Sequence, residues 1–209
     1  MAESESGTSL AQHVVPLDAG AHVVAGAFVE GAPALALADG AVLIGGPEEQ
    51  KRVLAHPDAA MLTAISDGKT LLTGGDDGRV VAVRADGGLE QIADEKGLWI
   101  DALALRGNAR AWSAGKQVRA RDEAGTVHAW SAPTTVRGLA FQPKGFRLAA
   151  THYNGATLWF PKVEGAPQTL EWKGAHLDVT FSPDGRFSSP RCRRTRCTDG
   201  GSPIRATCA

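Results

Sequence analysis

The chain has few of the residues that usually carry chemistry. It contains three cysteines among 209 residues, and all three lie near the C-terminus, at Cys192, Cys197 and Cys208. The zinc-protease pattern H-E-x-x-H, the nucleophile pattern G-x-S-x-G and a phosphate-binding glycine loop do not occur. These absences argue against catalysis, so we predict that the chain is not an enzyme and uses no cofactor.

Long apolar runs are also missing. No segment approaches the roughly 18 apolar residues that span a bilayer, and the polar, acidic start MAESESGTSL does not read as a signal peptide. The formal net charge of −1 gives no basic surface for nucleic acid. We therefore expect a soluble cytoplasmic protein, with no membrane contact and no nucleic-acid binding by its main body.

A repeat of about 38 residues is present instead. Apolar anchor residues recur at intervals of 37, 40, 36 and 40 residues, and they are Phe28, Ile65, Leu105, Phe141 and Phe181. A second marker, glycine, recurs at intervals of 38, 37 and 40 residues, at Gly40, Gly78, Gly115 and Gly155. Two markers with one period indicate a stack of similar structural units.

Each unit has the pattern of β-strands. Segments such as TLLTG, RVVAV and ATLWF alternate with a period of two, while Asp39-Gly40, Asp77-Gly78 and Asn154-Gly155 are hairpin signals. Segments such as KRVLA, EQIAD, VHAWS and QTLEW mix charged and apolar residues, as an exposed outer strand does. The sequence predicts an all-β fold with four strands per unit. We interpret the acidic GGDDG segment at 74–78 as a hairpin turn rather than a calcium loop.

The segments VTFSPDG at 179–185, LAFQPKG at 139–145 and NGATLWF at 154–160 resemble WD40 repeats. The whole stretch 136–187 also resembles an uncharacterised bacterial group of WD40 proteins. The signature histidine of the family is matched by His56 and, less closely, by His176. Its closing Trp-Asp pair is reduced to Trp159-Phe160, so the family's His–Ser/Thr–Asp–Trp network is incomplete in each repeat. The resemblance implies a β-propeller of four-stranded blades, with about four and a half repeats present and an incomplete ring.

The character of the sequence changes after Phe187. Residues 188–209 contain five arginines against one aspartate, a net charge of +4, and the fifth repeat stops after its first strand. If one base is restored after codon 187, allowed codons encode FVVTAMQENALHGWRLADSRHMR, which continues the repeat. We therefore expect a disordered tail over 1–13, a partial propeller over 14–187 and a non-native or disordered basic tail over 188–209. The alternative is a genuine tail that binds a metal or RNA through its cysteines and arginines.

Propellers commonly act through the ends of their channel, so residues at or just before the start of the inner strands are candidates for a binding surface. Asp101 and Arg137 are charges where a buried strand prefers apolar residues, although they could simply pair with each other or with solvent. The full set of candidates for a partner-binding face is His56, Met61, Trp99, Asp101, Arg137 and His176.

The sequence favours a non-catalytic scaffold that binds an unidentified protein partner, in the form of a truncated fragment of a longer propeller. A ligand or metal site at the channel mouth is the alternative, for which only Asp101 and Asp178 lie at a suitable depth. RNA binding through the arginine-rich tail is a third possibility.

Overall fold

The computed structural model describes residues 14–192. The described residues form sixteen strands and no helix. They build four antiparallel sheets of four strands each. The first sheet contains β1 (Val23–Val29), β2 (Ala32–Leu37), β3 (Ala41–Gly45) and β4 (Gln50–Leu54). The second contains β5 (Met61–Ser66), β6 (Thr70–Gly75), β7 (Arg79–Arg84) and β8 (Leu89–Asp94).

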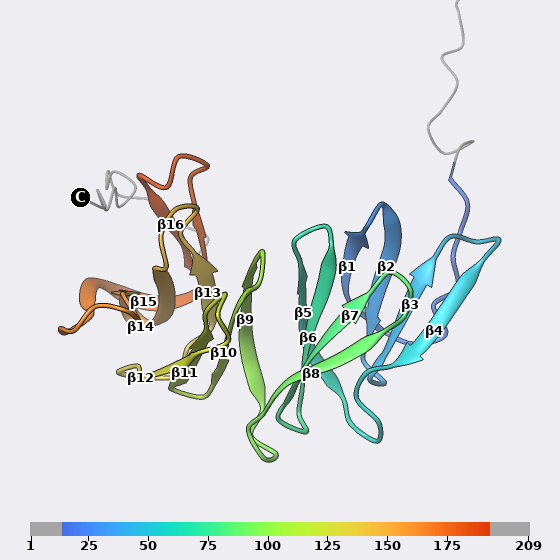
Figure 1. Cartoon of the computed structure of the whole chain (residues 1–209), viewed down its shortest axis with the longest axis horizontal. Coiled ribbons are helices and arrows are strands. Elements are labelled where there is room, and N and C mark those ends of the chain that lie inside the picture. Colours follow the sequence, from blue (N-terminus) through green and yellow to red (C-terminus); the bar gives the residue numbers. More distant parts are fainter. Residues whose placement is uncertain (1–13, 193–209) are drawn as a thin grey trace, which may run out of the picture.

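The third sheet contains β9 (Ile100–Arg106), β10 (Ala109–Ala114), β11 (Gln117–Arg121) and β12 (Val127–Ser131). The fourth contains β13 (Gly138–Phe141), β14 (Leu148–Trp159), β15 (Gln168–Phe181) and β16 (Ser188–Cys192). The sheets fan out in an arc, with β1–β4 at one end and β13–β16 at the other (Figure 1). Their first strands, β1, β5, β9 and β13, are neighbours along the inside of this arc. The fold is thus all-β and is a β-propeller, as the repeat predicts.

The middle strands of a blade are buried on both faces. Along β6 and β7, Leu71, Val81 and Val83 pack against the first sheet, whereas Leu72, Val80 and Ala82 pack against the third. Successive side chains of a strand point to opposite faces, so each strand supplies two different inter-blade cores. This double burial explains why RVVAVR, residues 79–84, is continuously apolar between its two arginines.

The strands β14 and β15 are long because each changes direction. Nε2 of His152 lies 2.9 Å from the hydroxyl of Thr157, whereas five residues of straight strand span about 16 Å. The chain therefore reverses at Asn154, whose φ is +63°. In the same way, Nε2 of His176 lies 2.9 Å from the carbonyl of Trp172, so β15 bends between them.

After that bend, β15 pairs with β16 instead of β14, beginning at His176↔Cys192 and ending at Phe181↔Ser188. Residues 176–192 are accordingly the first hairpin of a fifth blade. Residues 188–192 continue the sheet as β16, so this part of the expected basic tail is ordered, and its non-native origin stays a prediction. The rest of that tail and the expected disordered segment 1–13 lie outside the described residues.

Candidate interaction surface at the channel rim

One end of the propeller, which we call the channel rim, is where β5, β9 and β13 begin. It is formed by the connecting loops 55–60, 95–99 and 132–137 and by the hairpin turns at Gly40, Gly78 and Gly115. Each connecting loop is fastened to the turn of the blade that precedes it. The amide of His56 donates to the carbonyl of Gly40, that of Glu95 to Gly78 and that of Val136 to Gly115, all at 2.9 Å. The rim is therefore a hydrogen-bonded framework rather than a set of free loops.

Glycine is required where a loop lies on a turn. Gly40 has φ of +83°, and a Cβ placed on it would come within 2.6 Å of the carbonyl oxygen of Ala59. Only a residue without a side chain allows both the left-handed conformation and this close approach. The recurring glycine of the repeat thus has a direct role in docking the connecting loop.

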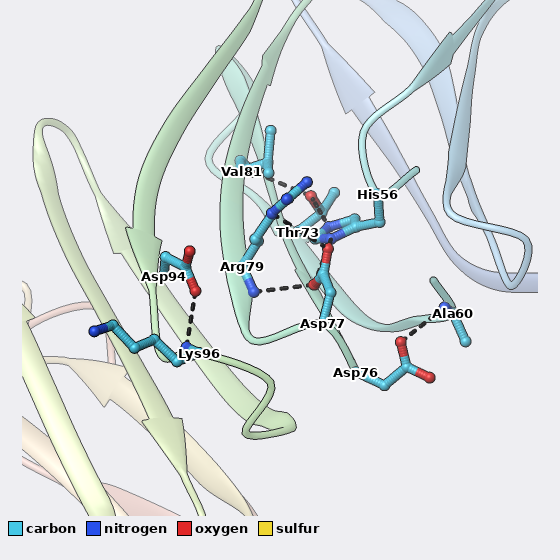
Figure 2. A network of polar contacts seen from close by, with 9 residues as sticks. All are labelled: His56, Ala60, Thr73, Asp76, Asp77, Arg79, Val81, Asp94 and Lys96. Atoms are coloured by element: carbon cyan, nitrogen blue, oxygen red, sulfur yellow. Dashed lines mark hydrogen bonds and ion pairs between the residues drawn. The ribbon is translucent and has the colours of Figure 1, made fainter. Parts of the chain in front are cut away.

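A buried polar network fixes the second blade at the rim (Figure 2). Nδ1 of His56 lies 3.1 Å from the carboxylate of Asp77, in the β6–β7 turn, and Nε2 lies 2.9 Å from the hydroxyl of Thr73, on β6. A carboxylate can only accept, so Nδ1 of His56 donates to Asp77. The hydroxyl of Thr73 has one proton and lies within hydrogen-bond distance of both Nε2 of His56 and the carbonyl of Val81, at 2.9 and 3.1 Å. The neighbouring Asp76 accepts from the amide of Ala60 at 2.9 Å.

The charge state of His56 follows from its burial. Its side chain is fully buried, and this burial lowers its pKa below the ordinary 6.5, while Asp77 opposes the shift. The neutral ring therefore acts as a structural cross-link between a connecting loop and its blade. Sequence reasoning missed Thr73 and Asp77, which follow His56 by 17 and 21 residues.

Three of the candidate residues lie inside the protein. His56 is 0% exposed, Met61 2% and His176 2%. Met61 belongs to the core between the first two blades, and His176 is covered where β15 bends. These three residues were expected on a partner-binding face, but because they are buried, none of them offers surface to another molecule.

The other three candidates are brought together at the rim. Trp99 ends the loop before β9 and is 65% exposed. Asp101 accepts from the amide of Gly115 at 2.7 Å and lies 3.5 Å from a guanidinium nitrogen of Arg137. The Asp101 side chain is 15% exposed and the Arg137 side chain 58%, so the carboxylate is held inside while the guanidinium faces outward.

A groove of about 590 Å³ runs along the inside of the arc from this rim. Asp101, Arg137 and Asp178 line it near the rim, and Ile65, Leu105, Phe141 and Phe181 line it farther along the inner strands. Four of the five repeat anchors thus form an apolar wall, and the charged candidates stand at the end of this wall. Asp178 is paired across the strands with Arg191, another lining residue.

Residues 14–192 contain no group of three or more His, Cys, Asp or Glu side chains arranged to hold a metal ion. Within the same residues, no helix has the length and apolar character that crossing a membrane requires.

Comparison with known proteins supports the fold. No protein-family model matches the chain, and no curated protein matches it, whereas 727 chains of solved structures do. One of them is BBS1N, a β-propeller, in a crystal structure described as BBS1N in complex with ARL6DN and soaked with mercury. It is similar with a TM-score of 0.65 and 15% sequence identity, and the match covers 84% of this chain and 63% of BBS1N. The chain thus spans less than two thirds of that structure, and the likeness confirms a β-propeller fold.

Proposed function

We propose that the chain is a non-catalytic, WD40-like scaffold that binds a protein partner at its channel rim. The observation that carries this proposal is the pair of exposed side chains, Trp99 and Arg137, on a rim whose loops are fixed by backbone hydrogen bonds. Tryptophan and arginine are enriched among residues that dominate binding energy in protein interfaces. A rigid rim also lowers the entropic cost of ordering them.

The similarity to BBS1N gives a precedent of the same kind. That propeller was crystallised with a protein, ARL6DN, and a shared fold shows that such a scaffold can present a protein-binding surface. Function does not follow from fold alone, so the proposal rests on the rim residues of this chain. A cytoplasmic setting in a bacterium, and a reading-frame change after Phe187, remain part of the proposal as predictions from the sequence.

Site-specific photo-crosslinking tests the proposal. A photoreactive amino acid replaces Trp99 in one variant and Phe28 in a control. Phe28 is 64% exposed, nearly the same as Trp99 at 65%, but it lies at the far end of an inner strand. In extracts of the source cells, we expect protein adducts from position 99 that are lost when Arg137 is also changed to Gln. Equal adducts from both positions, or none from position 99, would contradict the proposal.

A small-molecule site is the second candidate. The groove volume of about 590 Å³ lies in the range of ligand pockets, and the groove combines an apolar wall with charges at one end. Binding of a small metabolite that protects groove residues such as Leu105 from labelling, with no protein adduct at position 99, would favour this candidate.

A further inference from the structure

The acidic and basic side chains of the rim differ in how many hydrogen bonds they form within the protein. Most of its carboxylates are turned toward the protein and accept hydrogen bonds there: Asp76 from Ala60, Asp77 from His56, and Asp101 from Gly115. Glu95, in the next loop, accepts from the indole of Trp112 at 2.7 Å. Three other carboxylates of the rim are exposed: Asp39 in the turn at Gly40, which pairs with Arg52, Asp58 in the loop before β5, and Asp94 at the end of β8.

The cations of the same rim face outward. Lys96 and Lys116 are exposed, and neither forms an ion pair with any residue of the described range 14–192. Arg137 has one long contact with a carboxylate, 3.5 Å to Asp101, whose other oxygen is used by Gly115. Donors of Arg137 therefore remain available to a second carboxylate.

The strand pairing brings the segments that carry Lys116 and Arg137 to the end of β9 where Trp99 lies. Ile100 is paired with Ala114, so Trp99 stands opposite the turn that contains Gly115 and Lys116. Asp101 then joins this turn to Arg137 through its two oxygens. We call Trp99, Lys116 and Arg137 the rim patch: an exposed aromatic side chain and two outward-facing cations on neighbouring segments of the rim.

We propose that the rim patch binds an acidic linear segment of a partner protein, in which one or two Asp or Glu residues stand beside an apolar residue. The partner carboxylates contact Arg137 and Lys116, where a guanidinium can form two parallel hydrogen bonds to one carboxylate. The apolar side chain covers the exposed ring of Trp99. This inference rests on the proposed function and specifies the chemistry of the partner.

Peptide selection tests the inference. Immobilised full-length chain selects from a phage-displayed library of random peptides, and an enriched peptide is synthesised and its affinity measured by fluorescence anisotropy. We expect enrichment of Asp or Glu next to Leu, Phe or Ile, and weaker binding at higher salt. Binding weakens at least tenfold in Arg137→Glu and in Lys116→Glu. The matched control is Lys69→Glu, because Lys69 is an exposed cation in the β5–β6 turn, at the opposite end of the blade.

Three results would overturn the inference: enrichment of basic or neutral peptides, an equal loss of binding in Lys69→Glu, or binding of a labelled single-stranded oligonucleotide by the same residues in place of the peptide. Circular dichroism of each variant shows whether it folds, and Arg137→Gln and Lys116→Gln give milder losses in the same order. The proposed function is tested separately, because crosslinking at position 99 persists if the partner binds there without an acidic segment. Loss of both signals would remove both proposals.

Discussion

Nε2 of His56 lies 2.9 Å from the hydroxyl of Thr73, and this contact joins a connecting loop to the second strand of the blade that follows it. Both residues are 0% exposed, so water does not replace the bond if one partner is lost. The ring is held from its other side by Asp77. The second blade is thus fixed by side chains at the same end where the loops present the rim patch.

Replacing Thr73 by Val tests the energetic value of this contact. The side chain keeps its shape, but the buried Nε2 of His56 loses its hydrogen-bond partner, which costs about 1–3 kcal/mol. Urea unfolding measures the change. Thr70→Val, at the start of the same strand and only half-buried, is the control and should change stability by less than about 0.5 kcal/mol. Similar losses in the two variants would show that the hydroxyl of Thr73 has no special role.

The pH dependence of stability follows from the lowered pKa of His56. The unfolded chain takes up a proton at this residue as the pH falls through 6.5, while the folded chain still holds the neutral ring. The folded state binds fewer protons, so its contribution to stability is complete above 6.5 and is lost as the pH falls toward the lower folded pKa. We expect the drop in unfolding free energy between about pH 7.5 and about pH 5.5 to be smaller in His56→Gln than in the original chain. An equal drop in both proteins would exclude His56 as its source.

The repeat in the sequence predicted the blades closely because each repeat contains the same order of inner, middle and outer strands. The anchors Phe28, Ile65, Leu105 and Phe141 lie near the ends of the inner strands β1, β5, β9 and β13, as their spacing requires. The mixed segments also became outer strands, such as Leu89–Asp94. Apolar spacing is a local property of the chain, so it can be read without a structure.

The rim could be predicted only in part. Asp101 and Arg137 can be predicted from the sequence because charge is unusual at the start of a buried strand, and their pairing is one of the arrangements that the sequence allows. The burial of Met61 and His176 depends on how neighbouring blades cover them, and this information is not local. Lys116 was missed because an exposed lysine in a turn is ordinary until strand pairing places it opposite Trp99.

Alanine substitutions at two glycines with the same backbone conformation separate the energetic cost of backbone strain from the cost of displacing a docked loop. Gly31 and Gly40 have φ of +82° and +83°, but a Cβ on Gly31 meets nothing within 4 Å, while one on Gly40 meets the loop that contains His56 and Ala59. We expect Gly31→Ala to lose about 1–2 kcal/mol from the left-handed conformation alone. Gly40→Ala should lose clearly more, because the loop must also move. Equal losses, measured by thermal unfolding, would mean that the loop docks on Gly40 without steric need.

Two tryptophans at the third blade, Trp99 and Trp112, should respond in opposite ways. Trp112 is 2% exposed, and its indole N–H donates to Glu95 at 2.7 Å, so Trp112→Phe removes a buried hydrogen bond and leaves a gap beside the carboxylate. We expect a loss of about 1–3 kcal/mol in unfolding free energy, with little change in peptide affinity if the fold persists. Trp99→Ala, at a side chain 65% exposed, should alter stability by less than about 0.5 kcal/mol while it weakens peptide binding. Denaturant unfolding and anisotropy on the same two variants measure both effects. If Trp99→Ala lowered stability as much as Trp112→Phe, the ring would be a structural part of the rim, and its exposure would no longer support a role in binding.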